Sequence, residues 1–493
     1  MSGNVSSGRV SGGIPVRVSY SAVVTTGIYC LPTCSGRPRP EHVHEYTHAA
    51  AAEAAGFRAC LRCRPYRAAE PVSWAGPELV CRAVQLILGG ALDGGTEADL
   101  GARLGVSARH LRRLFAAQIG VTPDGLARSR RTHFARRILD DTDLPVADVA
   151  FASGFGSIRQ LNRACLDVFR APPKELRARR RKTDRLVADG GLCLRLPLRA
   201  PFDWQAALDY FAARAIPGVE EVAGGVYRRT IEVDGDTGVI ELMPPGPAGS
   251  GAGSFDHLVL RAHLPHWEGL IHLVERARRI AGLDTDYPEA TALLEGDDVL
   301  GPLVAKRPGL RVPGAWDPFE TGVRAIVGQQ VTVAGASRLT GRIVERFGRP
   351  VAGLSQLGLT HAFPTAADLA GHDLAGLGLT PARQDAVRAF SLAVATGEVR
   401  LDRSIGLEEL MASLTAIRGV GPWTAAYLAL RLGEPDAFPA ADLGLRRGVN
   451  PVDPPSAAAL TRMSERWAPW RALAARHLWA AASDAGTGDR GRR

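Results

Sequence analysis

The chain has 493 residues, enough for several domains, and carries a formal net charge of +9 with a pI of about 9.5. No apolar run reaches the roughly 18 residues of a membrane span, and the segment 1–13 lacks the apolar core of a secretory signal. We therefore expect a cytoplasmic protein with no membrane partner, whose mostly arginine charge suits a polyanion such as nucleic acid.

The first predicted domain, residues 1–75, contains two closely spaced cysteine pairs: Cys30 with Cys34, and Cys60 with Cys63. Four thiolates at this spacing are typical of a tetrahedral zinc site, and a domain with little apolar sequence would gain much of its folding free energy from the metal. Because four cysteines already complete the shell, we expect the histidines nearby to lie on the surface: His42, His44 and His48. The remaining cysteines are expected to be small buried residues: Cys81, Cys165 and Cys193.

The residues around the two pairs, TTGIYCLPTC and EAAGFRACLRCRP, resemble the Ada-type methylphosphotriester domain. In that family one zinc-bound thiolate accepts a methyl group from the DNA backbone, and the position in the motif implies that Cys30 is the acceptor. A methylated phosphate is uncharged and does not repel a thiolate, which is consistent with this chemistry. A purely structural zinc that holds a DNA clamp together remains the alternative.

The next predicted domain, residues 77–182, is all helical and contains two helix-turn-helix units, at 98–115 and 146–169. Gly105 and Gly154 are predicted to make the turns, and Ser107 and Ser157 to cap the second helix of each unit. The two units resemble the paired units of AraC-type regulators, which implies binding to promoter DNA and regulation of transcription. An ordinary helical bundle with solvated arginines is the alternative.

Both capped helices carry side chains that can contact base edges in the major groove: Arg109, Arg112 and Arg113 in the first, and Arg159, Gln160 and Arg163 in the second. Arginine pairs with guanine and glutamine with adenine, and two units about one helical turn apart can contact successive major grooves. These residues predict sequence-specific DNA binding. The basic segment 177–185 is expected to be a solvated linker.

Residues 190–300 predict a small α+β subdomain. The alternating leucines at 192–198 predict one strand, and the segments 226–233 and 257–264 predict two more around a Pro- and Gly-rich loop at 244–253. From Leu270 onward the pattern is helical, so we expect an all-helical domain at 301–484 and a disordered tail at 485–493.

The segment 417–442 predicts a tight helical hairpin followed by a lone carboxylate. An apolar helix face ends at Ile417, Gly419 and Gly421 turn the chain, and Pro422 suits the first position of the next helix. Glycines let the backbone approach a phosphate closely, and the N-terminus of the following helix offers unpaired amides to that anion. We therefore predict that the hairpin holds DNA.

This segment resembles the helix-hairpin-helix DNA glycosylase superfamily, and the segments 308–333 and 465–479 resemble its AlkA-type members, the 3-methyladenine DNA glycosylases II. The resemblance implies that Asp442 is the catalytic carboxylate and that Trp423, Tyr427 and Trp479 form the pocket for the flipped base. Electron-rich rings suit a cationic alkylated base, and a carboxylate can stabilise the sugar cation. Alternatively, Asp442 only caps a helix that begins at Leu443, and the aromatic residues are ordinary core.

The type of reaction follows from the lysines. The chain has only Lys174, Lys182 and Lys306, all upstream of the hairpin, and Trp423 stands where bifunctional members of the superfamily carry a lysine nucleophile. We therefore expect monofunctional hydrolysis of the glycosidic bond. No cysteine follows Cys193, so no iron–sulfur cluster is expected. Gln330 lies where the family inserts a side chain into the gap left by the flipped base.

These patterns predict a mainly α, multidomain protein. Its parts are a small zinc-bound α+β domain, an all-α double helix-turn-helix domain, and an α+β subdomain that leads into an all-α helix-hairpin-helix glycosylase domain. We expect a monomer with one Zn²⁺ that binds damaged and promoter double-stranded DNA and has the transcription machinery as a further partner. The favoured function is a fused alkylation response; the alternative is a DNA-binding regulator with a non-catalytic glycosylase fold.

Overall fold

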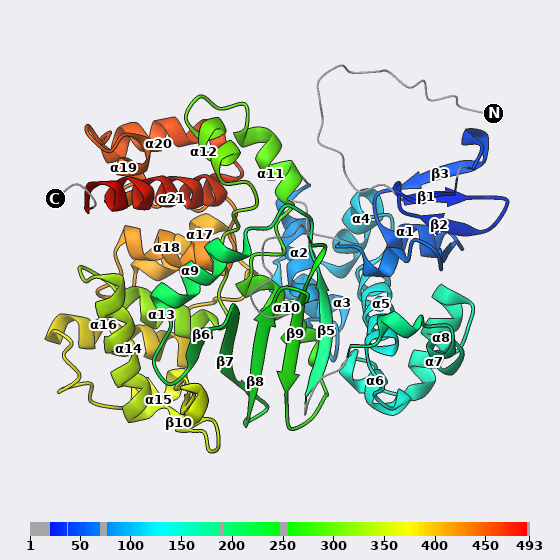
Figure 1. Ribbon diagram of the computed structural model, residues 1–493, viewed down its shortest axis with the longest axis horizontal. Helices are drawn as coiled ribbons and strands as arrows, with labels where there is room; N and C mark the ends of the chain where they lie inside the picture. The colour runs from blue at the N-terminus through cyan, green and yellow to red at the C-terminus, as the bar shows by residue number, and fades with distance from the viewer. Residues whose placement is uncertain (1–19, 37, 70–75, 187–190, 247–254, 491–493) are drawn as a thin grey trace.

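The computed structural model describes residues 20–36, 38–69, 76–186, 191–246 and 255–490, with the side chains of 486–490 left out. From the blue to the red end of Figure 1, a small sheet is followed by a helical bundle, a five-stranded sheet and a larger group of helices. The predicted fold class is therefore confirmed. Within these described residues, no helix combines the length and the apolar character needed to cross a membrane.

The first part is a four-stranded sheet of order β3-β1-β2-β4, in which only β2 and β4 run parallel. Its core is small: the buried rings of Tyr20 and Tyr29 meet edge to face at 5.7 Å, and several alanines surround them. Because so little apolar area is buried, a bound metal would supply a large share of the folding free energy of this part. The elements are β1 (Tyr20–Val23), β2 (Ile28–Cys30), η1 (Pro40–His42), β3 (Val43–Tyr46), α1 (Ala49–Ala54), β4 (Arg58–Ala59) and η2 (Pro65–Arg67).

The second part contains the two predicted helix-turn-helix units, α3–α4 and α6–α7, joined by the long helix α5. Ser107 Oγ accepts a hydrogen bond from His110 N and Ser157 Oγ accepts one from Gln160 N, both at 3.2 Å, which confirms the predicted caps. Gly105 and Gly154 have φ of 71° and 78° and make the turns. The elements are α2 (Glu78–Leu88), α3 (Glu97–Arg103), α4 (Ala108–Gln118), α5 (Pro123–Asp141), α6 (Val146–Ala152), α7 (Ile158–Phe169), α8 (Pro173–Ala178) and η3 (Lys182–Asp184).

The third part is an antiparallel sheet of order β5-β9-β8-β7-β6. Its buried side chains pack against two helices of the same part, α9 and α10. The three predicted strands are confirmed as β5, β7 and β9. The strand β8 was missed because its start, Asp236 to Gly238, has the composition of a turn. The elements are β5 (Leu192–Pro197), α9 (Trp204–Arg214), β6 (Glu220–Ala223), β7 (Val226–Val233), β8 (Asp236–Met243), β9 (His257–His263) and α10 (Leu270–Ile280).

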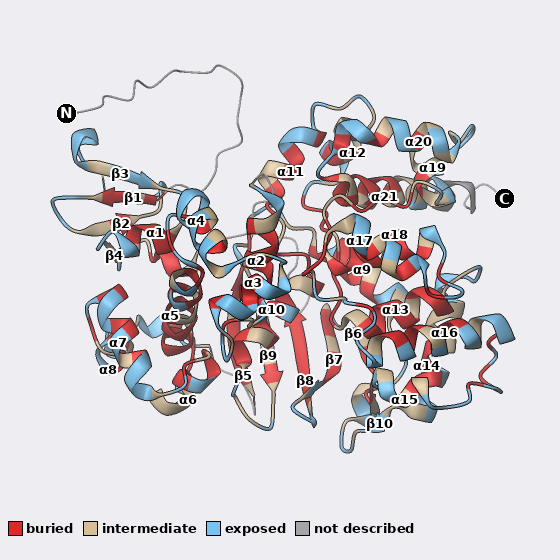
Figure 2. Ribbon diagram, turned by 180° about the vertical axis from the view of Figure 1, so that it is seen from behind, coloured by how far each residue is buried: buried red, intermediate tan, exposed pale blue. Residues whose placement is uncertain are grey.

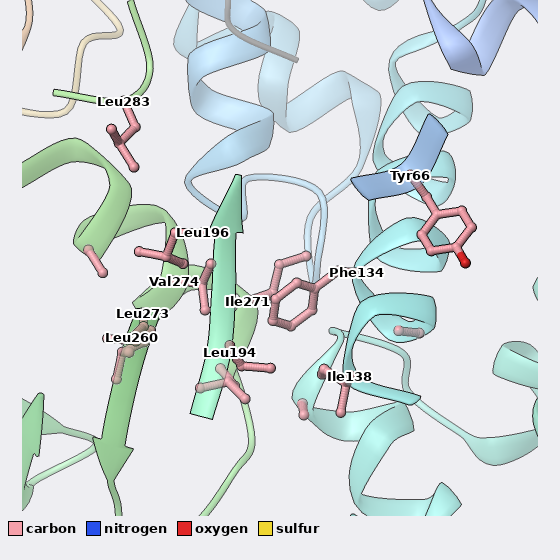
Figure 3. Packing of buried hydrophobic residues seen from close by; sticks show 14 of the residues in the cluster. Tyr66, Phe134, Ile138, Leu194, Leu196, Leu260, Ile271, Leu273, Val274 and Leu283 are labelled. Carbon is pink, nitrogen blue, oxygen red and sulfur yellow. The ribbon is translucent and has the colours of Figure 1, made fainter. Parts of the chain in front are cut away.

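The core of this sheet continues into the helix-turn-helix part. Figure 3 shows Phe134 and Ile138 of α5 facing side chains of β5 and α10, among them Leu194 and Ile271. All four belong to one cluster of buried apolar residues, which also includes the two tyrosines of the first sheet. The parts predicted as separate domains therefore share a continuous core.

The fourth part has its own apolar core and is almost all helical. The predicted hairpin is confirmed between α17 and α18, with Pro422 as the first residue of α18. The elements are α11 (Tyr287–Leu294), α12 (Leu300–Lys306), α13 (Pro318–Val327), α14 (Val333–Phe347), β10 (Arg349–Pro350), η4 (Ser355–Leu357), β11 (His361–Ala362), α15 (Ala366–Ala370), α16 (Pro381–Ala395), α17 (Leu407–Thr415), α18 (Pro422–Leu432), α19 (Leu443–Val449), α20 (Ala457–Ser464), η5 (Glu465–Trp467) and α21 (Arg471–Arg490).

The helix α21 continues to Arg490, into the segment 485–493 for which the sequence predicts a disordered tail. Just before that segment, Asp484 pairs with Lys306 at 2.8 Å and with Arg307 at 2.5 Å. These two ion pairs tie the last turns of α21 to α12 and stabilise helix where the composition alone favours disorder. The backbone up to Arg490 is therefore helical, contrary to the prediction.

Candidate active site and metal centre

The four predicted zinc ligands lie together at the ends of β2 and β4 and in the turns that follow. One sulfur from each of Cys30, Cys34, Cys60 and Cys63 lies within 4.8 Å of the others. The amides of Leu31 and Arg62 donate to Cys63 Sγ and Cys60 Sγ, both at 3.4 Å. Backbone amides aimed at sulfur stabilise thiolates, so this donor set suits one tetrahedral Zn²⁺.

A groove of about 900 Å³ opens beside the cysteine cluster. Cys30, Cys34 and Cys60 line it, together with Arg39 and Arg62. The histidines considered as alternative ligands are outside the cluster, and His42 and His44 are exposed, as predicted. The groove leaves three of the four cysteines accessible and places two arginines beside them, whose guanidinium groups suit phosphates.

The side chains predicted to contact bases are all exposed on the second helices of the two units, α4 and α7: Arg109, Arg112, Arg113, Arg159, Gln160 and Arg163. Figure 2 shows pale blue, exposed surface along both helices. Arg112 also pairs with Glu97 of α3, whose side chain is buried. Glu97 fixes the direction of the Arg112 side chain. It was not predicted, because it lies in the preceding helix and no local sequence pattern marks it.

In the fourth part, one cavity of about 1300 Å³ brings together the predicted catalytic, pocket and gap-filling residues: Gln330, Trp423, Tyr427, Asp442 and Trp479. The rings of Trp423 and Tyr427 are stacked at 5.5 Å with an interplanar angle of 6°, and Trp479 meets Tyr427 edge-on at 6.2 Å. All three aromatic residues are half-buried. They form a wall against which a planar base can stack.

Asp442 is both a helix cap and a cavity residue. Its Oδ1 accepts hydrogen bonds from Leu445 N at 2.9 Å and from Trp479 Nε1 at 3.0 Å, and its Oδ2 accepts one from Trp423 Nε1 at 2.9 Å. Three donors fix the orientation of the carboxylate. The two indoles therefore hold the carboxylate as well as line the pocket, a role that the sequence did not predict.

The hairpin meets the loop of Gln330 through its neighbour Gln329. Gln329 Nε2 donates to Gly419 O at 3.0 Å and to Thr424 Oγ1 at 2.9 Å. Gln330 itself is exposed, with a φ of 55°, at the edge of the cavity. The loop that carries Gln330 is thus anchored, through its neighbour, to the hairpin predicted to hold the phosphates.

Sequence reasoning missed the basic side of the cavity. The guanidinium carbons of Arg214, Arg431 and Arg476 lie 4.0, 5.3 and 5.4 Å from the centre of the Tyr210 ring. These residues come from α9, α18 and α21, and all of them line the cavity. No local motif could have revealed them, because they become neighbours only when three distant segments fold together.

Comparisons with known proteins find relatives for the separate parts of the chain and for most of its length. Three family models match the chain: the metal binding domain of Ada at residues 17–66, a helix-turn-helix domain at 100–179 and the AlkA N-terminal domain at 193–317. Among solved structures, the 3-methyladenine DNA-glycosylase from Archaeoglobus fulgidus has a TM-score of 0.51 at 24% identity and covers 59% of this chain and 98% of its own. At that identity it supports the fold alone.

Curated relatives extend the likeness over most of the chain. DNA-3-methyladenine glycosylase 2 of Escherichia coli (strain K12) is 34% identical over 283 residues, 57% of this chain and 94% of that protein. The "Probable bifunctional transcriptional activator/DNA repair enzyme AlkA" of Mycobacterium tuberculosis (strain ATCC 25618 / H37Rv) is 40% identical over 464 residues, 93% of this chain and 92% of that protein. The chain therefore belongs to the AlkA family of bifunctional transcriptional activators and DNA repair enzymes.

Proposed function

We propose that the chain excises alkylated bases, 3-methyladenine among them, by monofunctional hydrolysis of the N-glycosidic bond, with Asp442 as the catalytic carboxylate. A base alkylated on a ring nitrogen is cationic and leaves readily, so the enzyme must extrude it, stack it and stabilise the sugar cation. The observation that carries the proposal is the position of Asp442, held by the indoles of Trp423 and Trp479 in the wall of the cavity. A carboxylate there can stabilise the sugar cation and orient the attacking water.

The loops around the cavity suit the proposed handling of DNA. Gly419 and Gly421 would let the backbone approach a phosphate in front of the N-terminus of α18. Gln330 would enter the duplex and fill the space of the flipped nucleotide, because it is exposed at the edge of the cavity. Trp423, Tyr427 and Trp479 would stack on the extruded base.

An Asp442→Asn variant tests the catalytic role without removing the helix cap, because Asn caps helices as well as Asp does. We expect the rate of 3-methyladenine release to fall by about 10² to 10³, the usual loss when a transition-state charge contact is removed, while the chain stays folded because the amide oxygen still accepts from Leu445 N. Asp453→Asn, at an exposed position, is the matched control. Release at the wild-type rate by the Asp442→Asn variant would overturn the assignment and favour a regulator with a non-catalytic glycosylase fold.

For the first part of the chain, we propose that Cys30 accepts a methyl group from DNA methylphosphotriesters. Zinc, when bound, keeps the cysteine sulfurs as thiolates at neutral pH. In the transfer, a bond forms between Cys30 Sγ and the methyl carbon, the bond between that carbon and the phosphate oxygen breaks, and its electron pair leaves a phosphodiester anion. The groove beside Cys30 and its lining arginines support this role.

Peptide mapping by mass spectrometry tests the acceptor. The full chain, loaded with zinc, is incubated with DNA that carries methylphosphotriesters, and we expect a single methyl group on the peptide that contains Cys30. The cysteines further along the chain serve as internal controls: Cys60, Cys63, Cys81, Cys165 and Cys193. An unmethylated Cys30 peptide, with zinc content intact, would favour a structural clamp instead.

For the helix-turn-helix part, we propose that α4 and α7 bind promoter DNA and that the chain acts as a monomer at the bacterial nucleoid, in contact with the transcription machinery. The exposure of all six candidate side chains on these two helices supports the proposal. A footprint on promoter DNA that narrows when Arg159 and Arg163 are replaced by Ala would agree with it, because each unit then covers its own half of the footprint.

A further inference from the structure

A small cavity lies where the first three parts of the chain meet. Its walls come from η2 of the first part, α5 of the second and α10 of the third. Figure 3 shows this junction, with Phe134 of α5 facing Ile271 of α10. The cavity has a volume of about 80 Å³, several times the space that one water needs and well below the roughly 300 Å³ of a site for a drug-sized ligand. It therefore suits a small ion and excludes a nucleotide.

The walls of this cavity carry more positive than negative charge. The guanidinium groups of Arg130, Arg137 and Arg278 line it, whereas only two carboxylates do, those of Glu275 and Asp284. Arg130 Nη2 donates to Glu275 Oε1 at 2.7 Å, and Arg278 Nε lies 3.5 Å from Asp284 Oδ1. These two pairs use both carboxylates and leave the charge of Arg137 over.

Arg137 has no counterion. Among the residues that the structure describes, it donates no hydrogen bond and forms no ion pair, and its Nε is shielded from solvent. Its guanidinium carbon lies 5.3 Å from the centre of the Phe134 ring, which holds it in the wall. Burial and the nearby charge of Arg278 lower the pKa of Arg137 to about 10, so it is still positive at neutral pH. A shielded cation without a partner is unfavourable, and an anion in the cavity would offset that cost.

Other side chains of the wall are held by partners of their own. Arg278 Nη1 and Nη2 donate to the carbonyls of Pro197 and Leu283, at 2.7 and 3.1 Å. His133 Nε2 lies 2.5 Å from Glu53 Oε1, so this imidazole is fixed by a carboxylate outside the cavity wall. The shape and charge of the cavity are thus set before a ligand enters, which lowers the cost of binding.

We propose that this cavity binds one free phosphate ion, held by Arg137 together with the guanidinium groups of Arg130 and Arg278. A tetrahedral oxyanion can accept hydrogen bonds from several guanidinium groups at once, which chloride does less well. The bound ion would join η2, α5 and α10, and with them the zinc part, the regulator and the sheet that precedes the glycosylase helices. The site serves neither base excision nor methyl transfer, so it stands or falls independently of those proposals.

Equilibrium dialysis and urea unfolding of the full, zinc-loaded chain provide the test. We expect saturable binding of one radiolabelled phosphate ion per chain in the dialysis. We also expect a higher unfolding midpoint in phosphate than in chloride of equal ionic strength. At a phosphate concentration about 100 times its Kd, the ratio of folded to unfolded chain should rise about 100-fold, because only the folded chain has the cavity.

Arg137→Met removes the unpaired charge and keeps an unbranched apolar side chain against Phe134. We expect phosphate affinity to fall at least about tenfold, the usual effect of losing a hydrogen-bonded charge. In chloride, by contrast, the unfolding midpoint of this variant should equal or exceed that of the wild type, because no buried charge is left without a partner. Arg109→Met, at an exposed position of α4, is the matched control and should respond to phosphate like the wild type.

Three results would overturn the inference. The first is a wild-type chain without saturable phosphate binding, and the second is an equal response to phosphate in the wild type and in Arg137→Met. The third is tighter phosphate binding by Glu70→Gln, because Glu70 follows Ala69 of the cavity wall in the sequence, and such a gain would make its carboxylate the counterion of Arg137. Adenosine monophosphate is the size control: a midpoint shift with it that depends on Arg137 would contradict a site for the free ion.

Discussion

At the scale of single residues, Asp442 combines a helix cap with a place in the wall of the cavity. Its Oδ1 caps α19 through Leu445 N, and the same carboxylate accepts from the indoles of Trp423 and Trp479. The cap fixes the backbone, and the indoles fix the side chain, so the carboxylate is held in place before DNA arrives. Such preorganisation lowers the cost of stabilising a charged transition state.

At the scale of elements, the hairpin between α17 and α18 contains two glycines that serve different purposes. Gly419 has a φ of 86°, and a Cβ added there would lie 2.5 Å from the Cβ of Ala386 in α16. Gly421 has a φ of −87°, and a Cβ there would have open space. The first glycine is required by the fold, and the second is available for contact with DNA.

Gly419→Ala should destabilise the chain by about 1 to 3 kcal/mol, because a left-handed backbone and a close contact are both unfavourable for alanine. Gly421→Ala should keep the unfolding midpoint of the wild type and weaken only the affinity for DNA, because its methyl group would stand between the backbone and a phosphate. Urea unfolding and DNA binding of the two variants separate these effects. Equal unfolding midpoints for the two variants would contradict the structural role of Gly419.

At the scale of elements, some features could be predicted from the sequence and others could not. The cysteine cluster, the serine caps and the path from Gly419 to Asp442 were predictable, because short segments with a defined residue order determine them. The basic wall around Tyr210 was not, because α9, α18 and α21 meet only in the folded chain. The helical end of α21 was mispredicted for a similar reason: its ion pairs reach back to α12.

At the scale of the whole molecule, the regulator and the glycosylase are joined by buried contacts as well as by the chain. Arg82 of α2 binds both carboxylate oxygens of Glu434, at 2.9 and 3.0 Å, and both side chains are almost fully buried. Glu434 follows the end of α18 by two residues, so the helix that carries Trp423 and Tyr427 is fixed to the helix-turn-helix part. Nearby, Arg103 and Asp402 form a second, more exposed ion pair across the same interface.

The two ion pairs lead to losses of different size when the arginine is removed. Arg82→Ala leaves the carboxylate of Glu434 buried without its partner, which should cost about 3 to 5 kcal/mol, whereas Arg103→Ala breaks a pair of half-exposed side chains and should cost about 1 kcal/mol or less. Combining Arg82→Met with Glu434→Leu removes both charges and should restore most of the lost stability, because no buried charge is left unpaired.

Urea unfolding of the full chain, followed by circular dichroism and by base release, will measure these differences. Since Glu434 lies next to α18, loss of Arg82 should also reduce base excision at urea concentrations at which the wild type is still active. If Arg82→Ala is no more destabilising than Arg103→Ala, the buried pair does not hold the two halves together, and the regulator and the glycosylase respond to DNA as independent units.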